Sequence, residues 1–220
     1  RLTKIDETHF SPPTCTKTWF HQGPVGEEFG EWEELDFSQD YWNGDAQLLS
    51  HTEAVKAYLK NISSTYSTLT TQQQRKIKRH ALRTLRGSIL RTELYALDGS
   101  PLQEKPYTVT EQAYGLKEVE PPANGEQDRL HIFFPHLTAG RTTQWERGDD
   151  PMTQFSFTGN YDDFGQPLSQ TAVAPPRRMK NWTKLPDGTF ADETRILVTH
   201  ARTAYANPTT GAYIQDRIAS

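Results

Sequence analysis

The side chains that could do chemistry in this chain are carboxylates near its N-terminus. One short interval contains Glu27, Glu28, Glu31, Glu33, Glu34, Asp36, Asp40 and Asp45. A glycosidase needs two carboxylates at a defined separation over a sugar, and Trp19, Trp32 and Trp42 would suit sugar stacking. Carboxylates in such a run more often form a solvated face, so the run favours surface charge over catalysis.

The histidines and the single cysteine do not form a ligand or nucleophile pattern. No two histidines stand at the helical i,i+4 spacing, and they are scattered along the chain: His9, His21, His51, His80, His131, His136 and His200. Cys15 and His21 could be imagined as a thiol and its base, but a lone cysteine in a proline-containing loop is usually inert. The sequence therefore predicts no metal, no cofactor and no catalytic residue.

Basic residues gather in one predicted helix, at Arg75, Lys76, Lys78, Arg79, Arg83 and Arg86. They could bind phosphate or a membrane surface, but solvation and ion pairs with the acidic N-terminal third are the favoured interpretation. No glycine-rich phosphate loop, nucleophile elbow or zinc-knuckle pattern occurs.

Composition favours a piece of a larger β protein. Of 220 residues, 34% are hydrophobic and 11% aromatic, which suits strands that are buried on one face only, or a core completed by missing neighbours. A net charge of −4 without a basic stripe argues against nucleic acid. No apolar run reaches membrane-spanning length, and the first residues resemble no signal peptide and lack Met, so we expect the chain to start mid-protein.

Three segments are expected. Residues 1–50 predict an irregular, aromatic-rich segment with one strand at Thr16–His21. Residues 51–86 predict two helices, one over His51–Asn61 with Thr52 as a possible N-cap, and a stronger one over Thr70–Leu85 that ends before Gly87. Residues 87–220 predict an antiparallel sheet.

The strands of that sheet are predicted from period-two alternation between turns. The stretch from Gly87 to Tyr114 indicates a hairpin around Asp98-Gly99-Ser100-Pro101. The candidate strands are Ser88–Leu97, Tyr107–Glu118, Arg129–Phe134, Arg141–Arg147, Thr153–Tyr161, Leu168–Ala174, Thr194–Tyr205 and Ala212–Arg217. Short turns between them favour a mainly β, antiparallel meander with one or two helices in the N-terminal half.

Turns of the form Tyr-Asp-x-x-Gly-x-x-Leu recur along the chain. The clearest runs from Tyr161 to Leu168, and looser forms follow Tyr95 and Tyr205. An aromatic residue ends a strand, and a glycine allows the reversal into the next. The predicted structural residues are Trp19, Tyr95, Asp98, Gly99, Tyr107, Tyr161, Asp162 and Gly165.

Several pieces in one order resemble a known family. They are Thr16-Lys-Thr-Trp-Phe-His21, Ala81 to Ser100, Pro106 to Glu111, Ile132-Phe-Phe-Pro135, Gln144-Trp-Glu-Arg147 with Asp150-Pro151, the Tyr161 to Gly165 turn, and Pro175-Pro-Arg-Arg178. Together they resemble the middle-to-C-terminal region of the B component (TcB) of bacterial Tc insecticidal toxins, which is similar to Rhs/YD-repeat proteins. The sequence departs from the family's Tyr-x-Tyr-Glu-Arg-Asn-x-x-Asp-Pro pattern in two ways: Trp145 stands where the family has another aromatic residue, and the spacer before Asp150-Pro151 is shorter. Only one clear Tyr-Asp turn is present.

The resemblance implies a structural role. In that family the B and C components form a hollow β-sheet shell around a cytotoxic polypeptide, and a propeller elsewhere in the B component docks on the A component. This chain would then be a wall segment with no catalytic residues and no membrane insertion of its own. Its partners would be the remaining B segments and the C component, in a complex that assembles in the bacterial cytoplasm and is secreted.

Two other interpretations stay open. A carbohydrate-binding or carbohydrate-active β domain would place coplanar tryptophans in an open groove with two carboxylates nearby. An adhesion module could be built from the same hairpins. A shell segment should instead show long strands, unpaired sheet edges and no deep cleft lined by convergent acids.

Overall fold

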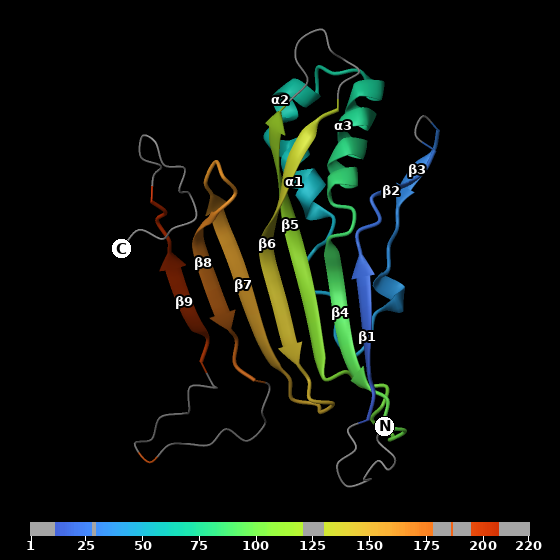
Figure 1. The fold of residues 1–220 in the computed structure, drawn as a ribbon, viewed down its shortest axis with the longest axis vertical. Helices are drawn as coiled ribbons and strands as arrows, with labels where there is room; N and C mark the ends of the chain where they lie inside the picture. Colours follow the sequence, from blue (N-terminus) through green and yellow to red (C-terminus); the bar gives the residue numbers. More distant parts are fainter. Residues whose placement is uncertain (1–11, 28–29, 121–129, 178–185, 187–194, 207–220) are drawn as a thin grey trace, which may run out of the picture.

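A computed structural model describes residues 12–27, 30–120, 130–177, 186 and 195–206. Its main feature is a seven-stranded sheet in the order β1-β4-β5-β6-β7-β8-β9, in which every neighbouring pair is antiparallel (Figure 1). The strands are β1 (Thr14–Phe20), β4 (Ile89–Ala96), β5 (Thr108–Glu120), β6 (Ile132–Gln144), β7 (Met152–Tyr161), β8 (Pro167–Ala174) and β9 (Leu197–Arg202). The predicted mainly β, antiparallel fold is confirmed.

Three α-helices precede β4 in the chain: α1 (Glu53–Asn61), α2 (Ser63–Tyr66) and α3 (Thr71–Thr84). As predicted, Thr70 caps α3, because its hydroxyl accepts from the Gln73 N–H while the Gln73 side chain accepts from the Thr70 N–H. Thr52 occupies the N-cap position of α1, as suggested, but its side chain makes no capping bond.

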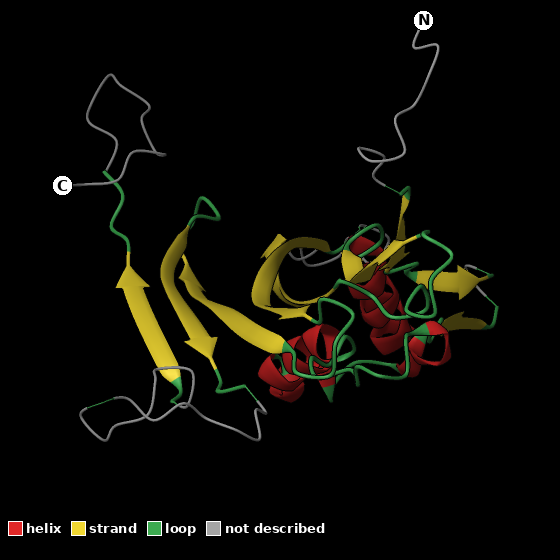
Figure 2. Ribbon diagram, turned by 90° about the horizontal axis from the view of Figure 1, so that it is seen from below, coloured by secondary structure: helices red, strands yellow, loops and turns green. Residues whose placement is uncertain are grey.

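Helices α1 and α3 each bury an apolar stripe against the sheet. Tyr58 of α1 meets Phe133 of β6 edge to face, with ring centroids 4.9 Å apart. The buried core around this pair also contains Ala54, Val55, Ile77, Ala81, Leu82 and Leu85. Strands β7–β9 extend away from the helices (Figure 2), so the core occupies only one part of the sheet.

Strand β6 differs from the prediction. The candidates Arg129–Phe134 and Arg141–Arg147 belong to one long strand, because the chain runs straight through Pro135 and His136. Strand β7 pairs only with residues 139–144 of β6, so Pro135 lies where β6 has β5 as its sole neighbour. A proline lacks the N–H of a ladder and is tolerated at such an open side. The strand ends at Gln144 because Glu146 and Arg147 have positive φ.

The N-terminal segment is more ordered than predicted. The expected strand at Thr16–His21 is found as β1, but a small hairpin of β2 (Pro24–Gly26) and β3 (Trp32–Glu34) was missed. Gly26 has φ +130, and an added Cβ would lie 2.4 Å from the carbonyl oxygen of Glu31. A three-residue strand gives too short a pattern for sequence analysis to detect. A 3-10 turn, Ser38–Asp40, follows.

The other strands agree with the prediction to within a few residues, except where the chain lies outside the described residues. That is so for Ala212–Arg217, for the turns at Pro121-Pro122, Asn124-Gly125 and Asn207-Pro208, and for all but Pro186 of the turn Pro186-Asp-Gly188. None of the described helices has the length and apolar character that a membrane crossing requires.

We predict that Leu85→Ala destabilises the chain by about 2–5 kcal/mol, because Leu85 is 1% exposed and the substitution leaves a cavity between α3 and the sheet. Leu102→Ala is the matched control, since Leu102 is 45% exposed, and should change stability by about 0.5 kcal/mol or less. Urea unfolding followed by circular dichroism measures both. Equal losses for the two variants would show that the helices do not form a core with the sheet.

Candidate functional site

The most unusual feature of the molecule is a cluster of charged side chains on the helix-facing side of the sheet, which we call the ion cluster. Its members are Arg91, Glu93, Glu111, Arg141 and Asp45, and all are buried. Arg91 is the centre: its Nε donates to Glu93 Oε1 at 2.7 Å, and its Nη1 donates to Glu111 Oε1 at 2.8 Å. Such charge-assisted bonds are needed because an unpaired charge in the interior costs several kcal/mol.

Strand register creates this cluster. Arg91 faces Glu111 across β4 and β5, and Glu111 faces Arg141 across β5 and β6. Arg141 Nη1 lies 2.6 Å from Asp45 Oδ1, and Arg141 Nε lies 3.1 Å from Glu111 Oε2. Two cations therefore alternate with carboxylates across three strands, which spreads the charge along the row.

The cluster also binds the loop that contains Tyr41 to Leu49. Glu93 Oε1 accepts from the Trp42 N–H at 2.9 Å, and Arg91 Nη2 donates to the Asp45 carbonyl at 3.0 Å. Glu111 Oε2 accepts from the N–H groups of Leu48 and Leu49. Backbone N–H and C=O groups of this irregular loop are thus hydrogen-bonded by side chains of β4 and β5.

Aromatic side chains close the cluster off from water. The Arg91 guanidinium lies 4.8 Å from the centroid of the Tyr41 ring, and Trp145 Nε1 donates to Asp45 Oδ2 at 2.6 Å. Tyr95 donates its hydroxyl proton to Glu93 Oε2. Burial, together with the bond to Glu93, raises the pKa of Tyr95, and burial raises the pKa of Tyr41 to about 12. Both phenols therefore stay protonated: Tyr95 donates a hydrogen bond to Glu93, and the Tyr41 ring covers Arg91.

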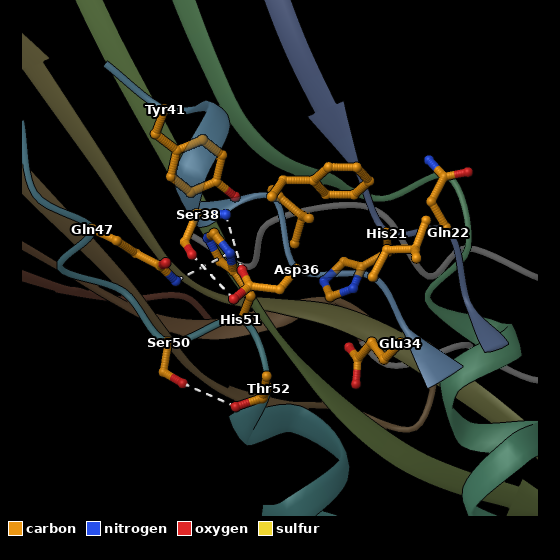
Figure 3. A pocket seen from close by; sticks show the side chains of 13 residues that line it. His21, Gln22, Glu34, Asp36, Ser38, Tyr41, Gln47, Ser50, His51 and Thr52 are labelled. Atoms are coloured by element: carbon orange, nitrogen blue, oxygen red, sulfur yellow. Dashed lines mark hydrogen bonds between the residues drawn. The ribbon is translucent and has the colours of Figure 1, made fainter. Parts of the chain in front are cut away.

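A cavity of about 330 Å³ lies beside the cluster (Figure 3). His21, Glu34, Asp36, Tyr41 and His51 are among its lining residues, and the figure shows His21, Glu34 and Asp36 converging on the same space. Asp36 is held by the N–H and the hydroxyl of Ser38, and these bonds lower its pKa.

The two histidines of this cavity are neutral at pH 7. Burial, with a smaller contribution from His51, lowers the pKa of His21 to about 4, and burial also lowers that of His51. Their ring centroids lie 6.4 Å apart. Across the described ranges, no three His, Cys, Asp or Glu side chains are placed to hold a metal ion together. Neutral imidazoles beside carboxylates could accept or donate protons in this cavity.

Six of the eight predicted structural residues form two groups. In the first, Arg147 joins two of them: its Nη1 lies 2.6 Å from Asp98 Oδ2, and its guanidinium lies over the Tyr107 ring at 5.3 Å. The bond to Arg147 lowers the pKa of Asp98. Gly99 takes φ +67 in the turn. Arg147 thus ties the β4–β5 connection to the end of β6.

The second group is the turn between β7 and β8. Tyr161 donates its hydroxyl to the Leu137 carbonyl at 2.5 Å, and Asp162 Oδ1 accepts from the N–H groups of Phe164 and Gln166. Gly165 has φ +80, and a Cβ there would lie 2.8 Å from Phe134 Cζ. The tyrosine therefore anchors the turn to β6.

The three tryptophans of the carbohydrate interpretation, Trp19, Trp32 and Trp42, pack apart from one another. Trp19 contacts Tyr41, Trp32 lies beneath Arg75 and Lys78, and Trp42 contacts Trp145 edge to face. They form no shared platform, so the carbohydrate interpretation is not supported. Trp19 and Tyr95 lie near the ion cluster, whereas the two turn groups lie at the ends of strands.

Sequence reasoning missed the ion cluster. The alternation of side chains along β4 puts Arg91 and Glu93 on one face, but their partners Glu111 and Arg141 are fixed by strand register, which the sequence does not show. Asp45 was assigned to a solvated run and is instead buried. The available signal was charge at alternate positions of strands that are otherwise apolar. The expected pairing of the basic helix with the acidic segment is seen where Arg75 Nη1 lies 3.9 Å from Glu31 Oε2.

These features define a sheet-forming structural segment whose one organised site is a buried ion network. The family model for the insecticide toxin TcdB middle/C-terminal region matches residues 80–207, and the chain belongs to this family. A comparison with curated proteins gives no match.

Solved structures agree with this family. A crystal structure of TcdB2-TccC3 without its hypervariable C-terminal region is 27% identical over 64% of this chain and 7% of that chain, with a TM-score of 0.53. The Photorhabdus luminescens Tc holotoxin pore is 22% identical over 92% and 9%, with a TM-score of 0.59. A crystal structure of TcdB2-TccC3 is 22% identical over 96% and 10%, with a TM-score of 0.58. This chain therefore spans no more than a tenth of each of these much longer chains.

We predict that Arg91→Met destabilises the chain by roughly 3–5 kcal/mol, because Glu93 and Glu111 keep their charges without their main partner. The control Lys56→Met removes an exposed ion pair with Glu53 and should change stability by about 0.5 kcal/mol or less. Adding Glu111→Gln to Arg91→Met should recover part of the loss in urea unfolding. Strict additivity would show that the two side chains do not interact.

We also predict a loss of stability in acid that depends on His21. Its folded pKa of about 4 lies below the ordinary histidine value of 6.5, so the unfolded state binds the proton first as pH falls. The contribution of neutral His21 is complete above pH 6.5 and falls progressively toward pH 4, by roughly 2–3 kcal/mol. In thermal unfolding between pH 7 and 4, the melting temperature of His21→Gln should fall less steeply with decreasing pH than that of the unsubstituted chain. An unchanged slope would contradict this account.

Proposed function

We propose that this chain is a non-catalytic wall segment of the B component of a Tc-type toxin. In this role it forms part of a β-sheet shell that, with a C component, encloses and delivers a cytotoxic polypeptide. Its partners are the other segments of the B component and the C component, and the A component is contacted elsewhere. The complex assembles in the bacterial cytoplasm and is secreted. Segments 1–50, 51–86 and 87–220 are successive parts of this wall.

The observation that carries the proposal is an antiparallel sheet with two open edges in a member of the TcdB family. Within the described residues, strands β1 and β9 each pair on one side only. All six residues of β9 are exposed, and Leu197 and Val198 are among them. An exposed edge strand with apolar side chains promotes aggregation, and a neighbouring strand from the rest of a wall would cover its open side.

Part of the helix-facing side is also uncovered. Phe155 and Phe157 of β7 stack with ring centroids 6.2 Å apart, and register places Val173 and Val198 beside them. The helices pack over β5 and β6 instead. Apolar strands that lack a covering layer fit a segment whose neighbours come from elsewhere in a larger polypeptide. Similarity to TcdB2-TccC3 structures supports a C component as a partner.

The shell is tested by protection of its contents. The longer B component that would contain this chain is expressed with its C component, and the complex is treated with a protease. We expect the cytotoxic polypeptide to survive in the complex and to be digested after the complex is denatured. Digestion at equal rates in both states would refute enclosure.

We predict that His200→Pro in this longer protein reduces the yield of the protected complex at least several-fold. The Thr203 N–H donates to the Leu168 carbonyl, so alternation points the His200 N–H away from β8, toward a further strand. Proline removes this donor without breaking the β8–β9 ladder. His200→Ala is the control, because it also loses the bond to Thr171 but keeps the N–H. Equal yields for the two variants would show that β9 is not extended.

A further inference from the structure

The two faces of the sheet differ in chemistry. One face holds the ion cluster. The other, which we call the neutral face, comprises the alternate residues that point away from the ion cluster at 14–18 of β1, 92–96 of β4, 108–112 of β5, 140–144 of β6, 152–158 of β7, 170–174 of β8 and 197–201 of β9.

Register aligns these residues in rows. Thr110 of β5 faces Thr142 of β6, which faces Gln154 of β7. In the next row Gln112 faces Gly140, which faces Ser156. These six residues surround a shallow depression of about 270 Å³ in the middle of the face, above Gly140, which has no side chain to fill it.

No residue of the neutral face, within the ranges given above, is Asp, Glu, Lys or Arg. Across the whole chain 24% of residues are charged, so a surface of this extent would ordinarily carry several charges. Threonine, glutamine and serine occupy most of its positions, with small or single apolar residues between them. Residues such as Gln154 and Ser156 are exposed, so the face is not part of the core.

This chemistry differs from that of common protein surfaces. A surface in bulk solvent usually mixes charges of both signs, a nucleic-acid surface is basic, and a permanent protein interface is more apolar. A hydroxyl and amide surface makes hydrogen bonds but no ion pairs. It therefore contacts polypeptides of any charge without holding one charge type strongly.

We infer that the neutral face lines the interior of the shell and is the wall that the enclosed polypeptide touches. This inference rests on the proposed function. A polypeptide carries acidic, basic and apolar stretches, and fixed charges on the wall would retain the oppositely charged ones. A wall without charges leaves the enclosed chain free to leave, while the helices and the ion cluster lie on the outer side.

Cross-linking of the complete B–C complex tests this assignment. With native Cys15 replaced by Ser, Gln154→Cys is labelled with a benzophenone maleimide before the B and C components are assembled, then irradiated. We expect cross-links to several regions of the cytotoxic polypeptide, identified by mass spectrometry. The matched control is Lys56→Cys on α1, where the lysine side chain is 67% exposed and lies on the helix side; it should give none.

The outcomes separate this inference from the proposed function. A protected polypeptide without cross-links to position 154 would overturn the face assignment and leave the shell intact. Cross-links to a single region of the cytotoxic polypeptide would overturn the idea that the neutral face contacts stretches of any charge without preference. An unprotected polypeptide would refute both the shell and the inference.

Discussion

The structure depends on the need to pair charges that have been removed from water. Arg91 and Arg141 together face three carboxylates, and each arginine reaches at least two of them. Because an unpaired buried ion costs several kcal/mol, β4, β5 and β6 are stable in this register only when the loop that carries Asp45 is also in place. The cluster therefore links strand register to the path of an otherwise irregular segment.

This constraint acts on one part of the sheet. Over β4–β6 the cluster and the helical core cover the sheet, and Arg147 and Tyr161 fix the turns at its ends. Beyond β6 the strands continue with good pairing but without a covering layer. The chain thus combines a part with a buried core, over β4–β6, with an extension, β7–β9, whose strands are paired but which leaves apolar side chains such as Phe157 exposed. Such an arrangement suits a segment whose uncovered strands pack against other segments of a larger protein.

Local patterns in the sequence predicted most of the fold, whereas its organised site could not be predicted. The capping box at Thr70 and the turn glycines Gly99 and Gly165 depend on neighbouring residues, so sequence alone reveals them. The unbroken path of β6 through Pro135 depends on where β7 stops pairing, which is a property of the sheet. The ion cluster depends on register between strands far apart in sequence, and a polar residue in a strand looks the same whether it is solvated or paired.

Placing the charges on one face gives the sheet two surfaces with different uses. A strand's side chains alternate, so a sheet that buries Arg91, Glu93 and Glu111 on one side leaves Thr92 and Thr110 on the other. Charge can then specify register and hold the loop without appearing on the opposite surface. A sheet whose buried face is apolar would instead present a second face that is either apolar or charged. Separating ionic specificity from an uncharged surface lets one layer of strands fix its register with charges on one side and remain uncharged on the other.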